Sequence, residues 1–144
     1  MTHVNQRYVL DSSAVIALLT QEQGADTVSN IITQFNRQKS GLYLSFVTLT
    51  EVYYATLRVK GEERARQLMG IMSELPVSVI HSDDKLCLSA GYIKAHFKLS
   101  LADAFIAATA LSKQAILVHK DPEFDTITDI VRCLRLPMKQ TPHG

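Results

Sequence analysis

Four acidic residues occupy positions where a carboxylate could do chemistry: Asp11, Glu51, Asp103 and Asp121. Asp11 ends a short apolar run in "VLDSS", and Asp121 follows another in "LVHKDPEF". Glu51 and Asp103 each lie three residues after a hydroxyl residue, in "TLTE" and "SLAD", where we expect the first turn of a helix. Carboxylates that converge repel one another and raise one another's pKa. A hard divalent cation such as Mg²⁺ or Mn²⁺ relieves that repulsion and prefers oxygen ligands.

Each acid also has a purely structural explanation. "TLTE" and "SLAD" resemble capping boxes, and an acid in the first turn gains about 0.3–1 kcal/mol from the helix dipole. Asp121 precedes Pro122, which suits a turn, and Asp11 could cap a following helix. Capping does not require one shared location, however, and it does not explain an acid that ends a strand. The arrangement of the elements therefore decides whether these acids form a site.

Short apolar runs alternate with segments of helical periodicity along the chain. This pattern predicts strands at 8–10, 42–46, 77–80, 115–118 and 130–134. It predicts helices at 13–19, 23–37, 48–59, around 65–72, from behind Ser82 to about 97, and at 100–113. Strands separated by helices indicate an α/β fold, with a mostly parallel sheet of about five strands covered on both faces. We expect one domain over 1–144, with loose tails at about 1–6 and 136–144.

The parallel sheet predicts that the four acids share one edge. Asp11 and Asp121 end strands, whereas Glu51 and Asp103 begin helices. Helices in such a fold run antiparallel to the strands, so helix N-termini and strand C-termini meet at the same edge. Open α/β sheets bind their ligands at this edge. The reasoning fixes the edge but not the distances between the acids.

Composition narrows the class of protein. The net charge of +1 provides no global attraction to nucleic acid, so any such contact requires a local patch. No apolar run approaches the length of about 18 residues that a membrane helix needs, and the N-terminus lacks the pattern of a secretory signal. Cys87 and Cys133 lie in apolar segments without metal-type spacing, and we expect both to be buried in a reducing cytoplasm. We therefore expect a cytoplasmic protein with no membrane contact.

In order and spacing, "YVLDSSAVIALL", "TLTEVYYA", "LADAFIAATAL" and "HKDPEF" resemble the four acidic motifs of PIN-domain ribonucleases. The similarity is greatest to the VapC type, the toxin of toxin–antitoxin pairs, and it runs from about Tyr8 to Leu134. The resemblance implies a three-layer α/β/α sandwich and a metal-dependent endoribonuclease that acts on single-stranded RNA or a structured-RNA loop. It also implies a small antitoxin as partner and a homodimer.

The resemblance implies roles for individual residues. Asp11, Asp103 and Asp121 would bind Mg²⁺ or Mn²⁺ directly, while Glu51 would act through water or orient the nucleophile. Ser13 matches a small polar position that holds a metal-bound water. His119 departs from the pattern, since the family usually has Thr or Ser there. It is interpreted as a substrate contact, a support for the acids, or only a strand-end residue. Further interpretations concern substrate contacts at Lys98, Lys120, Lys94 and Lys85, and Asp125 as an extra acid.

Other readings of the same acids remain to be weighed. A phosphorelay receiver needs an acidic pair after its first strand, and a D-x-D phosphatase needs an Asp where this chain has Ser13. Glycine-rich nucleotide loops are absent from the sequence. Two alternatives stay open: a PIN-like binding module with little nuclease activity, and a housekeeping RNA-processing nuclease.

Overall fold

The structure is a computed structural model that describes residues 6–35 and 40–138. Of the predicted tails at about 1–6 and 136–144, residues 1–5 and 139–144 lie outside the described residues. The strands are β1 (Tyr8–Leu10), β2 (Leu42–Ser45), β3 (Ser78–Ile80), β4 (Ile116–His119) and β5 (Cys133–Arg135). The helices are α1 (Ser12–Leu19), α2 (Ala25–Thr33), α3 (Phe46–Lys60), α4 (Glu62–Ser73), α5 (Asp84–His96) and α6 (Leu101–Lys113), with a 3₁₀ helix η1 (Pro122–Ile127).

The five strands form one fully parallel sheet in the order β3-β2-β1-β4-β5. From the central strand β1, the sheet continues through β2 to β3 on one side and through β4 to β5 on the other. The order reverses between β1 and β4, and the crevice outside such a reversal is where open α/β sheets bind ligands. Asp11 directly follows β1, and Asp121 lies two residues after the end of β4.

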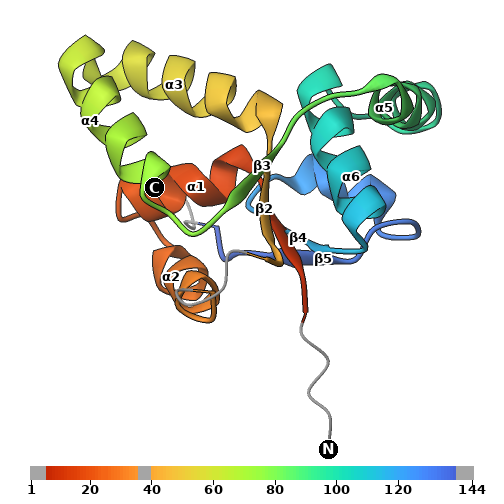
Figure 1. Ribbon diagram of the computed structural model, residues 1–144, viewed down its shortest axis with the longest axis horizontal. Helices are drawn as coiled ribbons and strands as arrows, with labels where there is room; N and C mark the ends of the chain where they lie inside the picture. Colours follow the sequence, from red (N-terminus) through yellow and green to blue (C-terminus); the bar gives the residue numbers. More distant parts are fainter. Residues whose placement is uncertain (1–5, 36–39, 139–144) are drawn as a thin grey trace, which may run out of the picture.

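Helices cover both faces of the sheet, so the predicted three-layer α/β/α sandwich is confirmed. Figure 1 shows α1, α2 and α4 on one side of the strands and α5 and α6 on the other. The strands alternate accordingly. Val9 and Leu117 pack in the cluster with α5 and α6, whereas Leu10 and Val118 pack in the cluster with α1, α2 and α4. All four side chains are fully buried.

Helix α3 begins earlier than the sequence pattern predicts. Ser45 is the N-cap, and its Oγ accepts a hydrogen bond from the Val47 N–H at 3.4 Å. The predicted capping box at Thr48 is therefore wrong, and Glu51 lies in the second turn of α3. The run "LYLSF" predicts a strand through Phe46 because phenylalanine favours strands, whereas the chain turns into the helix at that residue.

The end of the chain shows two further differences. β5 starts at Cys133 rather than at residue 130, because the N–H groups of Ile130 and Val131 both bond to the Ile127 carbonyl in a turn. Leu136 belongs to the core and is only 2% exposed, so the packed part of the chain extends past the predicted start of the tail. Its N–H donates to the His119 carbonyl at 2.7 Å, which continues the pairing of β5 with β4.

The remaining predictions concern smaller features. α2 is shorter than predicted and begins after Gly24, whose φ of 99° suits glycine. α5 is capped by Asp83 rather than Ser82. The predicted burial of both cysteines is wrong: Cys87 is exposed and Cys133 is half-buried. No helix among the described residues is long and apolar enough to cross a membrane.

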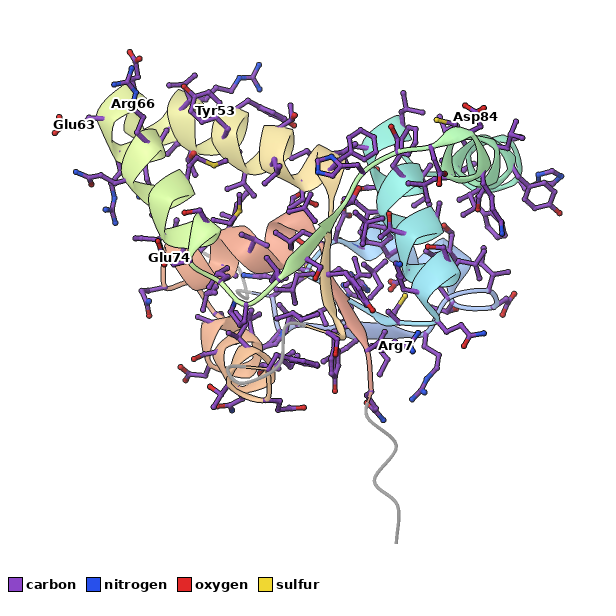
Figure 2. All side chains as sticks on the ribbon, in the orientation of Figure 1. Arg7, Tyr53, Glu63, Arg66, Glu74 and Asp84 are labelled. Carbon is purple, nitrogen blue, oxygen red and sulfur yellow. The ribbon has the colours of Figure 1, made fainter. Side chains whose placement is uncertain are left out.

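Charged side chains are distributed around the outside of these layers. Figure 2 shows Glu63 and Arg66 at the outer end of the α3–α4 hairpin, and Arg7 at the edge of the sheet where β1 begins. Arg66 forms an exposed ion pair with Glu62 at 2.7 Å, one helical turn away. Exposed pairs of this kind contribute little to stability. In contrast to these exposed charges, Asp11 and Asp103 are buried at the edge of the sheet where the strands end.

A candidate metal centre at the carboxyl edge of the sheet

Three carboxylates from separate elements meet at the edge where the strands end. Asp11 follows β1, Glu51 lies in α3 and Asp103 in the first turn of α6, and one oxygen of each lies within 4.8 Å of the others. We call these three residues the inner acidic group. Asp11 and Asp103 are only 3% and 6% exposed, and Glu51 is half-buried. The shared edge that the sequence predicts is thus confirmed for these acids.

A second group of carboxylates shares Asp103 with the first. Asp103, Asp121 and Glu123 each offer an oxygen within 4.8 Å of the others, and we call them the outer acidic group. Asp121 is half-buried and Glu123 is exposed. Glu123 is not among the site residues that the sequence predicts. Its position two residues after Asp121, across Pro122, was the available signal, because a proline turn can bring such neighbours to one side.

The acids and their neighbours also cap the local helices. Asp11 caps α1 by accepting the Ser13 N–H at 3.0 Å, and Asp121 caps η1 by accepting the Glu123 N–H at 2.9 Å. Ser100 caps α6 and accepts the Asp103 N–H at 3.1 Å. Capping and a role in a site are therefore compatible, because the caps fix the backbone that carries the carboxylates. The role of the acids in a site stays a prediction.

Hydroxyl groups from α1 hold the inner acidic group. The Ser12 Oγ donates to the Glu51 Oε1 at 2.7 Å, and the Ser13 Oγ donates to the Asp11 Oδ2. Ser13 Oγ in turn accepts the backbone N–H of Lys120 at 2.9 Å. These bonds connect α1 with α3 and with the end of β4. Because the Ser13 hydroxyl donates its hydrogen bond to Asp11, Ser13 orients that carboxylate.

The electrostatics at this edge oppose ionisation of the buried acids. Burial is the main cause that raises the pKa of Asp11 to about 6, against the hydrogen bonds from Ser13, which lower it. Burial, together with the charges of Asp11 and Asp121, raises the pKa of Asp103 to about 8. Such shifts are characteristic of functional sites. They arise because burial and mutual repulsion disfavour the charged form of each carboxyl group.

The residues present fit a divalent cation. The Asp11 Oδ1 is buried and has no hydrogen-bond partner within the described parts of the chain. A buried carboxylate oxygen without a partner carries an energetic cost that a cation would offset. All the donors of both groups are carboxylate oxygens, the ligand type that Mg²⁺ and Mn²⁺ prefer.

The other predicted site residues divide between the edge and its surroundings. His119 is fully buried at the end of β4, so the interpretation as a direct substrate contact is wrong, while the interpretations as a support for the acids and as a strand-end residue stay open. Burial lowers the pKa of His119 below its ordinary value. Lys120 is half-buried beside Asp121, while Lys98 is exposed in the segment before α6. Asp125 lies in neither acidic group and pairs with Arg135 at 3.0 Å.

Solved structures with the same fold include several VapBC and VapC proteins. VapBC2 of Rickettsia felis bound to a promoter DNA fragment has a TM-score of 0.73 at 16% identity, covering 92% of this chain and 100% of that one. DNA-bound VapBC of Salmonella typhimurium has a TM-score of 0.70 at 23% identity, covering 90% and 98%. Mycobacterium tuberculosis VapC20, a toxin that cleaves the sarcin–ricin loop, has a TM-score of 0.66 at 18% identity, covering 83% and 94%.

Sequence comparison gives a second, independent result. No curated protein sequence matches the chain significantly. A family model described as the PIN domain matches residues 8–130, from β1 to the turn before β5. The matched segment contains every member of both acidic groups. The chain therefore belongs to the PIN domain family.

Proposed function

We propose that this PIN domain protein is a divalent-metal-dependent endoribonuclease that cleaves single-stranded RNA or the loop of a structured RNA. The observation that carries the proposal is the inner acidic group, in which a buried Asp11 oxygen has no hydrogen-bond partner among the described residues and lies beside two further carboxylates. Family membership supports it, and VapC20, which has the same fold, is a toxin that cleaves the sarcin–ricin loop. Because the net charge of the chain is only +1, it would recognise RNA through a local surface rather than through overall charge.

The residues divide the work as follows. Mg²⁺ or Mn²⁺, when bound, supplies positive charge to the phosphodiester and lowers the pKa of a water molecule. Asp11, Asp103 and Asp121 would hold the ion directly. Glu51, fixed by the Ser12 hydroxyl, would orient the attacking water or act through one. Ser13 keeps the second oxygen of Asp11 in place, so the unpartnered oxygen remains available.

Lysines beside this edge are the candidate substrate contacts. Lys98 precedes the α6 N-terminus that carries Asp103, and Lys120 is the neighbour of Asp121. A single strand of RNA can lay its phosphates along such cations. Lys85 and Lys94 are exposed on α5 and extend the candidate surface.

The direct test compares RNA cleavage by the wild type and by an Asp103→Asn variant, each with Mg²⁺ and with Mn²⁺. We expect cleavage by the wild type that EDTA abolishes and that the variant lacks. Asp129→Asn is the matched control, because Asp129 is exposed and belongs to neither acidic group. Equal cleavage by the Asp103→Asn and Asp129→Asn proteins would identify a contaminating nuclease and contradict the proposal.

We further propose that the enzyme acts as the toxin of a type II toxin–antitoxin pair, with a small antitoxin protein as its partner. The supporting observation is the shared fold with VapBC complexes. Expression of the chain alone should arrest growth, and co-expression of the adjacent reading frame should restore it. Growth unaffected by the chain, with RNA cleavage intact in vitro, would favour the housekeeping nuclease. Growth arrest by an Asp103→Asn variant would favour the binding module.

A homodimer is also expected. Tyr54 and Leu101 are 45% and 61% exposed and line an apolar groove between α3 and α6. An apolar patch of this kind suits an interface with a second copy. Sedimentation equilibrium of the wild type and of a Leu101→Lys variant measures the association. A monomeric wild type would contradict the dimer without affecting the nuclease proposal.

A further inference from the structure

His119 is a fully buried polar residue at the point where the sheet edge turns into the outer acidic group. Its side chain has no exposed surface, and its ring packs against Phe124 with the centroids 5.0 Å apart. Its carbonyl accepts the Leu136 N–H, which ties the same residue to the strand pairing with β5. The ring is therefore held from both its side-chain and its main-chain ends.

One ring nitrogen has a defined partner and the other has none. The Asp121 backbone N–H donates to the His119 Nδ1 at 3.2 Å. The Nε2 is buried and without a hydrogen-bond partner in residues 6–35 and 40–138. A nitrogen that accepts a hydrogen bond carries no proton, so the ring proton is on Nε2. Among the described residues, Nδ1 is thus the ring nitrogen through which His119 forms a hydrogen bond.

The hydrogen bond to Nδ1 leads directly to the outer acidic group. Asp121 uses its N–H on the ring and its Oδ1 on the Glu123 N–H at 2.9 Å. Phe124, the next residue of η1, is fully buried against the same ring. The imidazole therefore supports both the residue that begins this turn and a residue within it, while the carboxylates of Asp121 and Glu123 lie within 4.8 Å of Asp103.

We propose that His119 is a positioning residue whose Nδ1 fixes the Asp121 backbone and so places the outer acidic group for a divalent cation. This inference rests on the proposed function in so far as the acids bind a metal. His119 touches neither substrate nor metal and acts only through Asp121. Groups that orient metal ligands typically change metal affinity about 10- to 100-fold when they are removed.

Three substitutions separate the acceptor from the rest of the side chain. His119→Asn places an amide oxygen at the position of Nδ1, whereas His119→Gln places one further out, near the position of Nε2. His119→Leu replaces the ring with an apolar side chain of comparable size and supplies no acceptor. His96→Leu is the matched control, because His96 is exposed on α5. Thermal unfolding of each variant establishes that it is folded before its binding is compared.

The first measurement is the dissociation constant for Mn²⁺ alone, by electron paramagnetic resonance of the free ion. We expect His119→Leu and His119→Gln to bind about 10- to 100-fold more weakly than the wild type. His119→Asn and His96→Leu should stay close to it. Wild-type affinity in a folded His119→Leu protein, or an equal loss in His119→Asn, would overturn the positioning role.

The second measurement needs no metal. Nitrogen-15 chemical shifts of the His119 ring should show a proton on Nε2 and none on Nδ1. The Asp121 amide should exchange faster with solvent in the Leu and Gln variants than in the Asn variant. A proton on Nδ1, or the same exchange rate in all variants, would overturn the inference even where Mn²⁺ binds. Absence of Mn²⁺ binding by the wild type would instead contradict the proposed function.

Discussion

The inner and outer acidic groups share Asp103 but are built from different parts of the fold. The inner group joins Asp11 after β1, Glu51 in the second turn of α3 and Asp103 in the first turn of α6, and hydroxyls of α1 hold two of these carboxylates. The outer group adds two residues of a single turn, Asp121 and Glu123, which are more exposed. Burial raises the pKa of Asp11 and Asp103. The difference shows that packing of the core brings together the buried carboxylates, whose ionisation is disfavoured. A local turn adds carboxylates that are more exposed to solvent beside them.

The largest expected effect is the difference in RNA cleavage between a variant of the inner acidic group and a variant of the outer one. Asp11→Asn should reduce RNA cleavage by more than about 100-fold, since it alters a buried ligand rather than one of its supports. Glu123→Gln should reduce it by less than about 10-fold, because water can replace the contacts of an exposed side chain. Single-turnover cleavage rates at a fixed Mg²⁺ concentration measure both. Equal losses in the two variants would mean that the groups act as one unit.

The next effect concerns stability against pH in the absence of metal. An acid with a raised pKa in the folded chain binds its proton more tightly there than in the unfolded chain. It therefore lowers the free energy of unfolding as the pH rises from about 4 to about 8. The stability of Asp103→Asn relative to the wild type should increase over this range, by at most about 1.4 kcal/mol per pH unit, and level off above it.

Urea unfolding of both proteins at several pH values measures this difference, with Asp129→Asn as the control. Saturating Mg²⁺ should stabilise the wild type most at high pH, because ligands bind the ion in their deprotonated form. A difference between wild type and Asp103→Asn that does not vary with pH would show that the buried charge is already compensated in the folded chain.

A smaller effect is expected from the hydroxyl that supports the inner group. Ser13→Ala removes the donor to Asp11 and leaves the Lys120 N–H without its acceptor. The free energy of unfolding should fall by about 1–3 kcal/mol, the cost of an unsatisfied polar group. Ser13→Thr keeps the hydroxyl and should recover most of this loss. Chemical denaturation measures both, and equal stability of Ser13→Ala and the wild type would contradict the role of Ser13.

The smallest effect is expected just beyond the outer group. Asp125 forms an exposed ion pair with Arg135, with about half of each side chain accessible. Asp125→Asn should change the free energy of unfolding by less than about 1 kcal/mol, as is usual for surface pairs. It should leave RNA cleavage unchanged. A large loss of cleavage in this variant would extend the outer group by one further acid.

The sequence by itself determined the class and order of the elements and the edge at which the acids lie. Helical periodicity and the Ser100 cap predicted α6 and the place of Asp103 in its first turn. The strand before Asp11 was predicted with its observed bounds. These features follow from local rules, because periodicity fixes the face of an element and a parallel sheet fixes the direction of its ends.

Only the tertiary structure decided which acids come together and which residues support them. The position of Glu51 depends on where α3 begins, and the role of Glu123 depends on the turn of η1. The exchange of an expected hydroxyl for His119 became interpretable only when its burial and its bond to the Asp121 N–H were visible. The physical reason is that distances between carboxylates are set by how α1, α3 and α6 pack around the sheet. No local pattern in the chain encodes that packing.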